Sequence, residues 1–319
     1  MELGYALSSE EHSPNQLVRF AAQAEAAGFT FALISDHFHP WTNQQGNSPF
    51  VWSVIGGIAQ ATERLRLGTG VTCPTIRIHP AIIAQAAATC AAMMPGRFFL
   101  GVGTGENLNE HVLGDPWPAL DTRQAMLDEA IEIIRLLWQG STRSFDGQFY
   151  TVQNARLYTL PDELPPIYMA ASGPESATLA GAIADGLIST SPSRKVVHAF
   201  RASDGESRPT YGQLTVCWAE DEAQARQTAY KWWPTAALGG ELGQELPLPA
   251  HFEQAARLVS ESDVAEAIVC GPDPERHLER IREFEAAGFD HVYIHQVGPD
   301  QEGFFRFYES EILSRELAA

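Results

Sequence analysis

The sequence predicts an α/β protein built as a (β/α)8 barrel, the TIM barrel, with insertions. Three observations support this fold class: short β-like runs alternate with helical patterns, one junction recurs near both ends of the chain, and the length suits one barrel. The chain has 319 residues, whereas a typical barrel of this kind has about 250 residues before insertions. We therefore expect a single domain over residues 1–319.

Eight short apolar runs are the expected strands, and segments with apolar residues at the helical period lie between them. The expected strands are Leu3–Leu7, Phe31–Ser35, Leu65–Val71, Phe98–Gly103, Ile167–Ala171, Gly186–Thr190, Gln213–Trp218 and His291–Val297. The expected helices are Gln16–Ala27, Val51–Thr62, Pro80–Met93, Thr122–Trp138, Glu175–Ala184, Lys195–Arg201, Glu222–Trp233, Phe252–Val259, Pro274–Ala287 and Gly303–Leu317. Strands that alternate with helices in this way form parallel βαβ units, and eight such units predict a closed barrel.

One junction and two interruptions refine this order. The sequence Glu-Ala-Ala-Gly-Phe occurs at Glu25–Phe29 and again at Glu285–Phe289. In each copy the glycine stands where a helix end needs a left-handed residue, and a strand follows. Phe145–Tyr158 has the pattern of a hairpin around Asp146-Gly147, so we expect an insertion over about residues 143–160. Pro234–Pro249 is weakly patterned, and we expect a lid or interface segment at about residues 234–250.

Charge and cysteine content exclude several classes of protein. Lys and Arg number 21 and Asp and Glu number 40, so the net charge is −19. Such an acidic chain is a poor partner for nucleic acid or an anionic membrane, whose phosphates require a basic surface. The N-terminus lacks the pattern of a secretory signal, and none of the 4 cysteines forms a CxxC pair. We therefore expect a reduced cytoplasmic protein without a structural metal.

Polar, titratable and glycine residues gather in the segments that follow the expected strands. In a (β/α)8 enzyme the active site lies on these segments. They are Ser8–Glu10, Asp36–Trp41, Gly70–Pro74, Gly103–His111, Ser172–Pro174, Ser191–Lys195 and His295–Gln296. The sequence therefore predicts a catalytic mouth at one end of the barrel.

His37 and His39 follow the second strand and allow three interpretations. They form a general base, a metal pair, or a polar loop in which a histidine bonds a backbone carbonyl. Barrel metallohydrolases need further His or Asp ligands at other strand ends. The fifth and sixth strands end in Ala171-Ser172 and Thr190-Ser191, which are poor ligands, so we expect no catalytic metal.

The other strand-end motifs also have a structural and a functional interpretation. Gly103-Thr104-Gly105-Glu106 is either a turn or a place where a ligand approaches the backbone closely. It is not a dinucleotide-binding motif, because Leu108 stands where that motif has its third glycine. Glu106 is an acid or base if burial raises its pKa. Alternatively, Glu106 and Glu110 lie four residues apart on a solvated helix face. The serines at 172, 191 and 193 are helix caps that also suit a phosphate.

These strand-end residues together resemble the coenzyme F420-dependent glucose-6-phosphate dehydrogenase family of the luciferase-like flavin and deazaflavin oxidoreductases. The most specific matches are Ser35–Trp41, Gly101–Glu110 and the end strand His291–Gly298, and the resemblance covers essentially the whole chain. It implies a luciferase-like barrel that binds the deazaflavin F420 at its C-terminal mouth. A hydride would then pass between the alcohol carbon of the substrate and C5 of the deazaflavin.

The resemblance also implies a role for each matching residue. His37 would be the base that removes the alcohol proton, Glu106 the acid that protonates the reduced ring, and Trp41 the residue that packs on the reacting centre. The implied substrate contacts are Glu10, Trp41, Thr190 and Ser193. The implied cofactor contacts are Asp36, Gly70, Val71, Thr104, Gly105, Asn109, Glu110, Ala171, Ser172, Gly173 and Ser191, with a bulged, often cis, peptide at Gly70–Val71.

The chain departs from this family at the substrate phosphate. The lysine expected after the sixth strand is Ser193 here, although Arg194 and Lys195 follow it. A second expected lysine falls at Val264–Ala267, where Glu266 would repel a phosphate. We therefore expect an alcohol substrate other than glucose 6-phosphate.

Three alternatives remain at this point. The first is an FMN-dependent luciferase-like monooxygenase, the second a metallohydrolase using His37 and His39, and the third a non-catalytic flavin-binding barrel. The presence of His37, Trp41 and Glu106 favours the F420-dependent enzyme. From the family we also expect a homodimer formed through a helical face.

Overall fold

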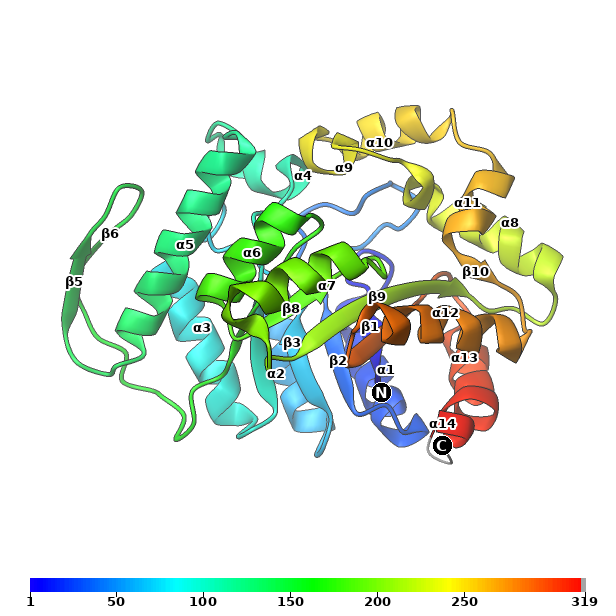
Figure 1. The fold of residues 1–319 in the computed structure, drawn as a ribbon, viewed down its shortest axis with the longest axis horizontal. Coiled ribbons are helices and arrows are strands. Elements are labelled where there is room, and N and C mark those ends of the chain that lie inside the picture. The colour runs from blue at the N-terminus through cyan, green and yellow to red at the C-terminus, as the bar shows by residue number, and fades with distance from the viewer. Residues whose placement is uncertain (317–319) are drawn as a thin grey trace.

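A closed barrel of parallel strands lies at the centre of the structure, a computed structural model that describes residues 1–316 (Figure 1). The barrel strands are β1 (Glu2–Leu7), β2 (Phe31–Ile34), β3 (Arg66–Thr69), β4 (Phe98–Val102), β7 (Ile167–Ala170), β8 (Gly186–Ser189), β9 (Thr210–Cys217) and β11 (His291–Gln296). Neighbours along the chain pair in parallel, and the ring closes where β11 pairs with β1. This arrangement confirms the predicted fold class, and each expected strand overlaps one of these strands.

One parallel strand was not predicted. β10 (Val269–Cys270) pairs with Val216 and Cys217 at the end of β9, whereas β8 pairs only with the beginning of β9. β10 therefore occupies the edge of β9 that β8 leaves free. A strand of 2 residues is too short to be recognised in a sequence, because the alternation of apolar and polar residues that marks a strand becomes visible only over about four residues or more.

Helices surround the barrel. They are α1 (Pro14–Ala27), α2 (Val51–Ala61), α3 (Pro80–Met93), α4 (Asn107–Glu110), α5 (Leu120–Leu137), α6 (Pro174–Ile183), α7 (Arg194–Phe200), α8 (Glu222–Trp232), α9 (Leu242–Glu245), α10 (Pro249–Ala256), α11 (Glu261–Ala267), α12 (Pro274–Ala287), α13 (Gln301–Phe307) and α14 (Ser314–Glu316). The short helices α4, α9 and α11 were not predicted. The expected last helix is divided by a π-helical stretch, Tyr308–Leu313, and its end at Leu317 lies outside the described residues.

The repeated junction has the same geometry in both copies. Gly28 ends α1 and Gly288 ends α12, with φ of 103° and 100° respectively. Only glycine adopts this region without strain, which is why the two helices stop there and the chain turns into β2 and β11.

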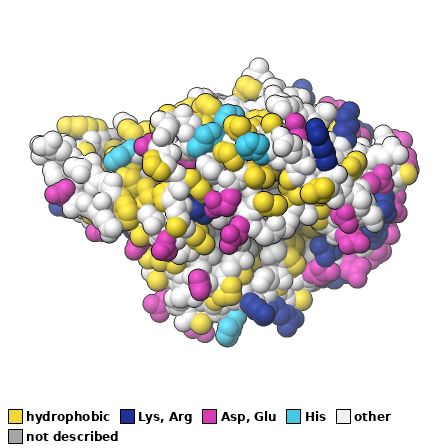
Figure 2. All heavy atoms as spheres, turned by 90° about the horizontal axis from the view of Figure 1, so that it is seen from above, with side chains coloured by type: hydrophobic (Ala, Val, Ile, Leu, Met, Phe, Trp, Pro, Cys, Tyr) yellow, Lys and Arg dark blue, Asp and Glu magenta, His cyan; other side chains and the backbone are white. Residues whose placement is uncertain are grey.

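Two further segments lie outside the barrel. The antiparallel strands β5 (Arg143–Asp146) and β6 (Thr151–Ala155) form a hairpin at one end of the molecule (Figure 1). Residues 233–256, hereafter the covering segment, include α9 and α10 and pass over the top of the barrel. Seen from above, charged side chains gather at the end of the molecule that carries α8, α11 and α12 (Figure 2), where Arg226 pairs with Glu222 and Glu261.

Inside the barrel, aromatic rings fill the end at which the strands begin. Phe31, Phe99, Tyr168 and Tyr211 are buried there and pack on one another. Gly68 makes room for this layer, because a Cβ at that position would lie 1.9 Å from Cε2 of Phe99. The open space of the barrel therefore lies at the other end.

Among residues 1–316, no helix has the length and apolar character needed to span a bilayer.

Candidate active site

A cavity of about 430 Å³ lies at the carboxyl ends of the barrel strands. Its walls come from the carboxyl-terminal parts of the barrel strands and the segments that follow them, from α5 and α6, and from the covering segment. Of the residues predicted from the sequence, it is lined by Glu10, His37, Trp41, Gly70, Val71, Thr104, Gly105, Glu106, Ala171, Ser172 and Thr190. One cavity thus gathers residues from segments far apart in the chain.

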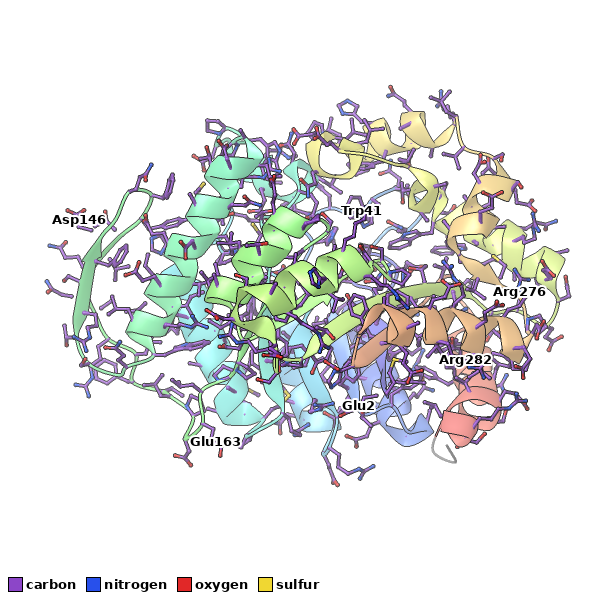
Figure 3. The ribbon with its side chains drawn as sticks, in the orientation of Figure 1. Glu2, Trp41, Asp146, Glu163, Arg276 and Arg282 are labelled. Atoms are coloured by element: carbon purple, nitrogen blue, oxygen red, sulfur yellow. The ribbon has the colours of Figure 1, made fainter. Side chains whose placement is uncertain are left out.

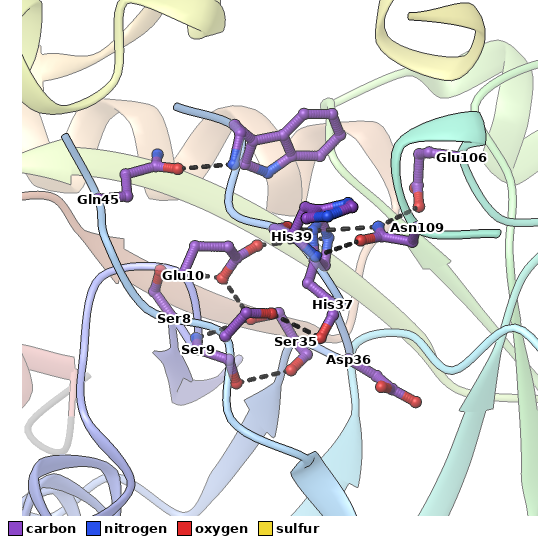
Figure 4. A network of polar contacts seen from close by, with 12 residues as sticks. Ser8, Ser9, Glu10, Ser35, Asp36, His37, His39, Gln45, Glu106 and Asn109 are labelled. Atoms are coloured by element: carbon purple, nitrogen blue, oxygen red, sulfur yellow. Dashed lines mark hydrogen bonds and ion pairs between the residues drawn. The ribbon is translucent and has the colours of Figure 1, made fainter. Parts of the chain in front are cut away.

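His37 lies at the wall of this cavity with both ring nitrogens engaged (Figure 4). Its Nε2 is 3.3 Å from Oε1 of Glu10. Its Nδ1 is 3.2 Å from the carbonyl oxygen of His39 and 3.1 Å from Nδ2 of Asn109. A ring nitrogen either donates or accepts, so an Nδ1 that donates its hydrogen to the carbonyl oxygen of His39 leaves the lone pair on Nε2, which is then the nitrogen that can exchange a proton with a ligand.

Glu10 is buried, and its carboxylate accepts several hydrogen bonds. Ser35 donates to Oε2 at 2.6 Å, and Ser8 donates to the same oxygen at 3.2 Å. Burial acts to raise the pKa of Glu10, but the His37 imidazole and the Ser35 hydroxyl outweigh it and lower the pKa from 4.5. Glu10 is therefore ionised at neutral pH, and its carboxylate lies beside Nε2 of His37.

Asn109 connects His37 to Glu106. Its Oδ1 accepts hydrogen bonds from the backbone N–H groups of Phe38 and His39, at 2.9 and 3.1 Å. These bonds fix the orientation of the amide, so Nδ2 points toward Nδ1 of His37 and toward Oε2 of Glu106, 3.4 Å away. Asn109 does not line the cavity itself, and it holds two residues that do.

Trp41 lies between the barrel strands and the covering segment (Figure 3). Its ring centroid is 5.0 Å from that of His37 and 5.1 Å from that of Phe252 in α10. Its backbone N–H donates to Oε1 of Gln45 at 2.9 Å. The indole is thereby held against the imidazole that faces the cavity.

Small residues form one side of the cavity. Gly70, Val71, Gly103 and Thr104 line it, and the Gly70–Val71 peptide bond is cis. Gly105 has φ of +78°, and a Cβ there would lie 2.6 Å from Sγ of Cys73. This wall has no side chain larger than valine, so it offers a surface for a flat ring.

A buried ion cluster supports that wall from behind. Arg77 lies 2.9 Å from Oδ1 of Asp36 and 3.5 Å from Oε1 of Glu110. Thr72, which follows the cis peptide, donates to Asp36 at 2.8 Å. Burial raises the pKa of Glu110 to about 7, although its bonds to Arg77 oppose the shift. Asp36 and Glu110 therefore lie behind the cavity and do not line it.

Of the residues predicted in the loops after β7 and β8, some line the cavity and others do not. Ser172 lines the cavity just before α6, whereas Gly173 occupies the N-cap position of that helix. Ser193 accepts a hydrogen bond from the N–H of Val196 and caps α7. Ser193, Gly173 and Ser191 are not among the residues that line the cavity.

His37 and His39 do not face a common point. Nδ1 of His39 lies 2.8 Å from the carbonyl oxygen of Leu108, and its ring stacks on His111. Across residues 1–316, no three His, Cys, Asp or Glu side chains are grouped as metal ligands.

The comparison with known proteins identifies the family. Residues 1–291 match the family model described as luciferase-like monooxygenase. The chain belongs to this family. It is 37% identical over 327 residues to the F420-dependent glucose-6-phosphate dehydrogenase of Microbacterium testaceum, covering 99% of this chain and 97% of that one. It is 35% identical over 331 residues to the enzyme of the same name from Mycobacterium tuberculosis, covering 99% and 98%.

Solved structures of luciferase-like barrels agree with this assignment. An F420-dependent secondary alcohol dehydrogenase in complex with an F420-acetone adduct superposes with a TM-score of 0.90 at 30% identity and covers 98% of both chains. The F420-dependent tetrahydromethanopterin reductase of Methanopyrus kandleri superposes with a TM-score of 0.79 at 22% identity, which shows the shared fold alone. The resemblance inferred from the sequence is thereby confirmed.

Several cavity residues of this luciferase-like chain were not assigned from the sequence. They are Gln124, Gln213, Trp233, Leu238, Gln244, Phe252, Tyr293 and His295. His295 alone carried a signal, because it ends a barrel strand; the others lie on helices, on the covering segment or inside strands. Among the described residues, the lining contains no lysine or arginine.

Proposed function

We propose that the chain is an F420-dependent oxidoreductase that transfers a hydride between the alcohol carbon of an uncharged hydroxylated substrate and C5 of the deazaflavin. The observation that carries this proposal is the meeting of His37, Glu106 and Trp41 in one cavity. The relatives named as F420-dependent dehydrogenases, at 35–37% identity over nearly the whole chain, support it.

The cavity fits a deazaflavin. The small residues at Gly70, Val71 and Gly103 leave a surface for a flat ring. The N-terminus of α6, where Ser172 and Ser176 line the cavity, suits the phosphate of a cofactor tail, because free backbone N–H groups bind anions there. When bound, the deazaflavin supplies the acceptor or donor of the hydride.

His37 and Glu10 act together on the alcohol proton. The hydroxyl must lose its proton as the hydride leaves, and Nε2 of His37 faces the cavity to receive it. The Glu10 carboxylate, 3.3 Å away, stabilises the charged imidazole that results. The carbonyl oxygen of His39 accepts a hydrogen bond from Nδ1 and holds the ring from the other side.

Glu106 and Trp41 complete the site. Glu106 is half-buried, lines the cavity and accepts a hydrogen bond from Nδ2 of Asn109, and it is the group to which we assign the proton exchange with the ring. Trp41 packs against His37 and excludes water from the reacting centre.

The charge of the cavity argues for an uncharged substrate. The described lining carries Glu10 and Glu106 and no lysine or arginine. A phosphate here would lack a cationic partner and would lie in the field of two carboxylates. We therefore propose an alcohol that bears no phosphate, in contrast to the substrate in the names of the relatives.

The experiment titrates the purified protein with F420 and, separately, with FMN, following ligand fluorescence. We expect tight binding of F420 and at least tenfold weaker binding of FMN. Oxidation of uncharged alcohols is then followed as loss of the oxidised deazaflavin band, with glucose 6-phosphate as the comparison. Preference for FMN would move the chain to the monooxygenases, and a micromolar KM for glucose 6-phosphate would contradict the uncharged substrate.

We further propose that residues 1–319 form one domain, that the protein is a cytoplasmic homodimer, and that it binds no nucleic acid. The net charge of −19 supports the last point. Exposed apolar side chains at Phe50, Ile82 and Met93, on and beside α2 and α3, support a helical dimer face. Light scattering would show a mass of one chain if the dimer is wrong.

A further inference from the structure

A second imidazole–carboxylate pair lies beside the first at the same cavity. Nε2 of His295, at the end of β11, is 3.0 Å from Oε2 of Glu11. The side chains of His295 and Glu11 are 3% and 0% exposed. The proposed reaction does not use this pair, although His295 lines the cavity together with His37.

Glu11 determines which nitrogen of His295 is engaged. Its Oε1 accepts a hydrogen bond from the N–H of Gly298 at 2.9 Å, which holds the carboxylate in place. A carboxylate only accepts hydrogen bonds, so Nε2 of His295 carries a hydrogen and donates it to Oε2. The unused bonding capacity of the ring is therefore at Nδ1.

Nδ1 of His295 has no hydrogen-bond partner in the described structure and is closed off from solvent. A buried polar atom without a partner destabilises the folded state, and nearly all such atoms in native proteins are satisfied. An orphan nitrogen on a residue that lines a ligand cavity is explained when the ligand supplies the missing partner.

The surroundings of His295 indicate the chemistry of that partner. The neighbouring cavity residue Gln213 has a neutral amide, and the described lining has no lysine or arginine to attract an anion. A hydroxyl group suits the free nitrogen, because it donates to a lone pair without bringing charge into the cavity. Trp233, another residue of the cavity lining, packs edge-on against the imidazole, with ring centroids 4.5 Å apart.

We propose that Nδ1 of His295 binds a second hydroxyl group of the substrate, which makes the substrate an uncharged diol, polyol or unphosphorylated sugar. This inference rests on the proposed alcohol oxidation. His37 binds the hydroxyl that reacts, and His295 binds one that does not. Glu10 and Glu11, consecutive residues after β1, each hold one of the two imidazoles.

The test compares butan-2-ol with butane-2,3-diol as substrates of the F420-loaded enzyme. In the wild type we expect a kcat/KM about tenfold higher for the diol, the effect of one hydrogen bond. His295→Gln keeps a donor for Glu11 and removes the contact at Nδ1, so we expect kcat/KM for the diol to fall about tenfold more than kcat/KM for butan-2-ol. His295→Asn places an amide near the Nδ1 position, and we expect it to restore part of the preference. His198→Gln, on the exposed face of α7, is the matched control.

A binding measurement without turnover gives an independent result. Calorimetric titration of the protein with butane-2,3-diol should show weaker binding to His295→Gln than to wild type, and equal binding to His198→Gln. Equal losses for both alcohols in His295→Gln would assign the imidazole to packing with Trp233 and overturn the proposal, as would a wild type without diol preference. Failure of F420 to bind, or of any alcohol to react, would instead contradict the proposed function.

Discussion

The two ends of the barrel interior are built from the same strands and have opposite character. We call the end at which the strands begin the lower end and the end that holds the cavity the upper end. Phe31, the first residue of β2, lies in the lower end, and Ser35, directly after β2, lines the cavity at the upper end. On β9, Tyr211 lies in the lower end and Gln213 in the upper end. Because side chains two apart share a face of a strand, stability and chemistry separate along the length of each strand. Substitutions at the upper end should therefore affect rate, and those at the lower end should affect folding.

The largest effect is expected for His37→Asn at the upper end. Loss of a general base lowers kcat by about 10²- to 10⁴-fold, whereas the melting temperature should change less than in the lower-end variant, because an asparagine amide keeps a donor beside the Glu10 carboxylate that pairs with His37. Stopped-flow or steady-state loss of the oxidised deazaflavin band measures the rate, and calorimetry measures stability. His198→Asn on the surface of α7 is the control. A variant that kept most of its kcat would remove His37 from the proton transfer.

Phe99→Ala at the lower end should have the reverse profile. Phe99 is 4% exposed and packs 5.0 Å from the ring of Tyr168, so truncation leaves a cavity and lowers the free energy of unfolding by about 3–5 kcal/mol. Denaturant titration measures this loss, and the KM of the folded fraction should stay within about twofold of wild type. Tyr158→Ala, at a ring that is 85% exposed, should cost less than about 1 kcal/mol. A small loss in Phe99→Ala would mean that the aromatic layer is not close-packed.

Glu110 lies behind the cavity wall, and its carboxyl group makes the free energy of unfolding depend on pH. Burial raises its pKa to about 7, above the ordinary value of 4.5, so between these values the folded chain holds a proton that the unfolded chain has lost. The free energy of unfolding therefore falls as pH rises across this window, by at most about 1.4 kcal/mol per pH unit. Glu110→Gln should remove this contribution, as measured by denaturant titration from pH 4.5 to 8. The exposed Glu163→Gln should keep the slope, and equal slopes in both variants would contradict the account.

The smallest effect is expected for Ser35→Ala. The Ser35 hydroxyl and the His37 imidazole together lower the pKa of Glu10 against the effect of burial. Removing the hydroxyl should raise that pKa and move the acid limb of the kcat/KM profile upward by less than about one pH unit. Ser9→Ala, whose hydroxyl donates to the carbonyl of Ser35 and not to Glu10, is the control. A downward shift of the acid limb would be inconsistent with the role assigned to Glu10.

Much of this arrangement could be predicted from the sequence, because barrel strands give continuous apolar runs and their ends give clusters of polar residues. His37, Trp41 and Glu106 follow such runs directly. The pairing of Glu11 with His295 could not be predicted, because it joins residues 284 positions apart. The buried cluster of Asp36, Arg77 and Glu110 could not be predicted for a related reason. A sequence shows that Asp36 and Glu110 follow strands, but only packing shows that Arg77 holds them behind the wall.

The aromatic layer in the lower half of the barrel has one further consequence, for the order of events during turnover. Phe31, Phe99, Tyr168 and Tyr211 are buried and pack together at that end, so we expect cofactor and substrate to enter by one route from the other end, where the cavity lies. Two molecules in a single passage cannot exchange places. Whichever binds deeper must arrive first and leave last, and initial-rate kinetics should accordingly show compulsory-order binding, in which the product released last competes with the substrate bound first.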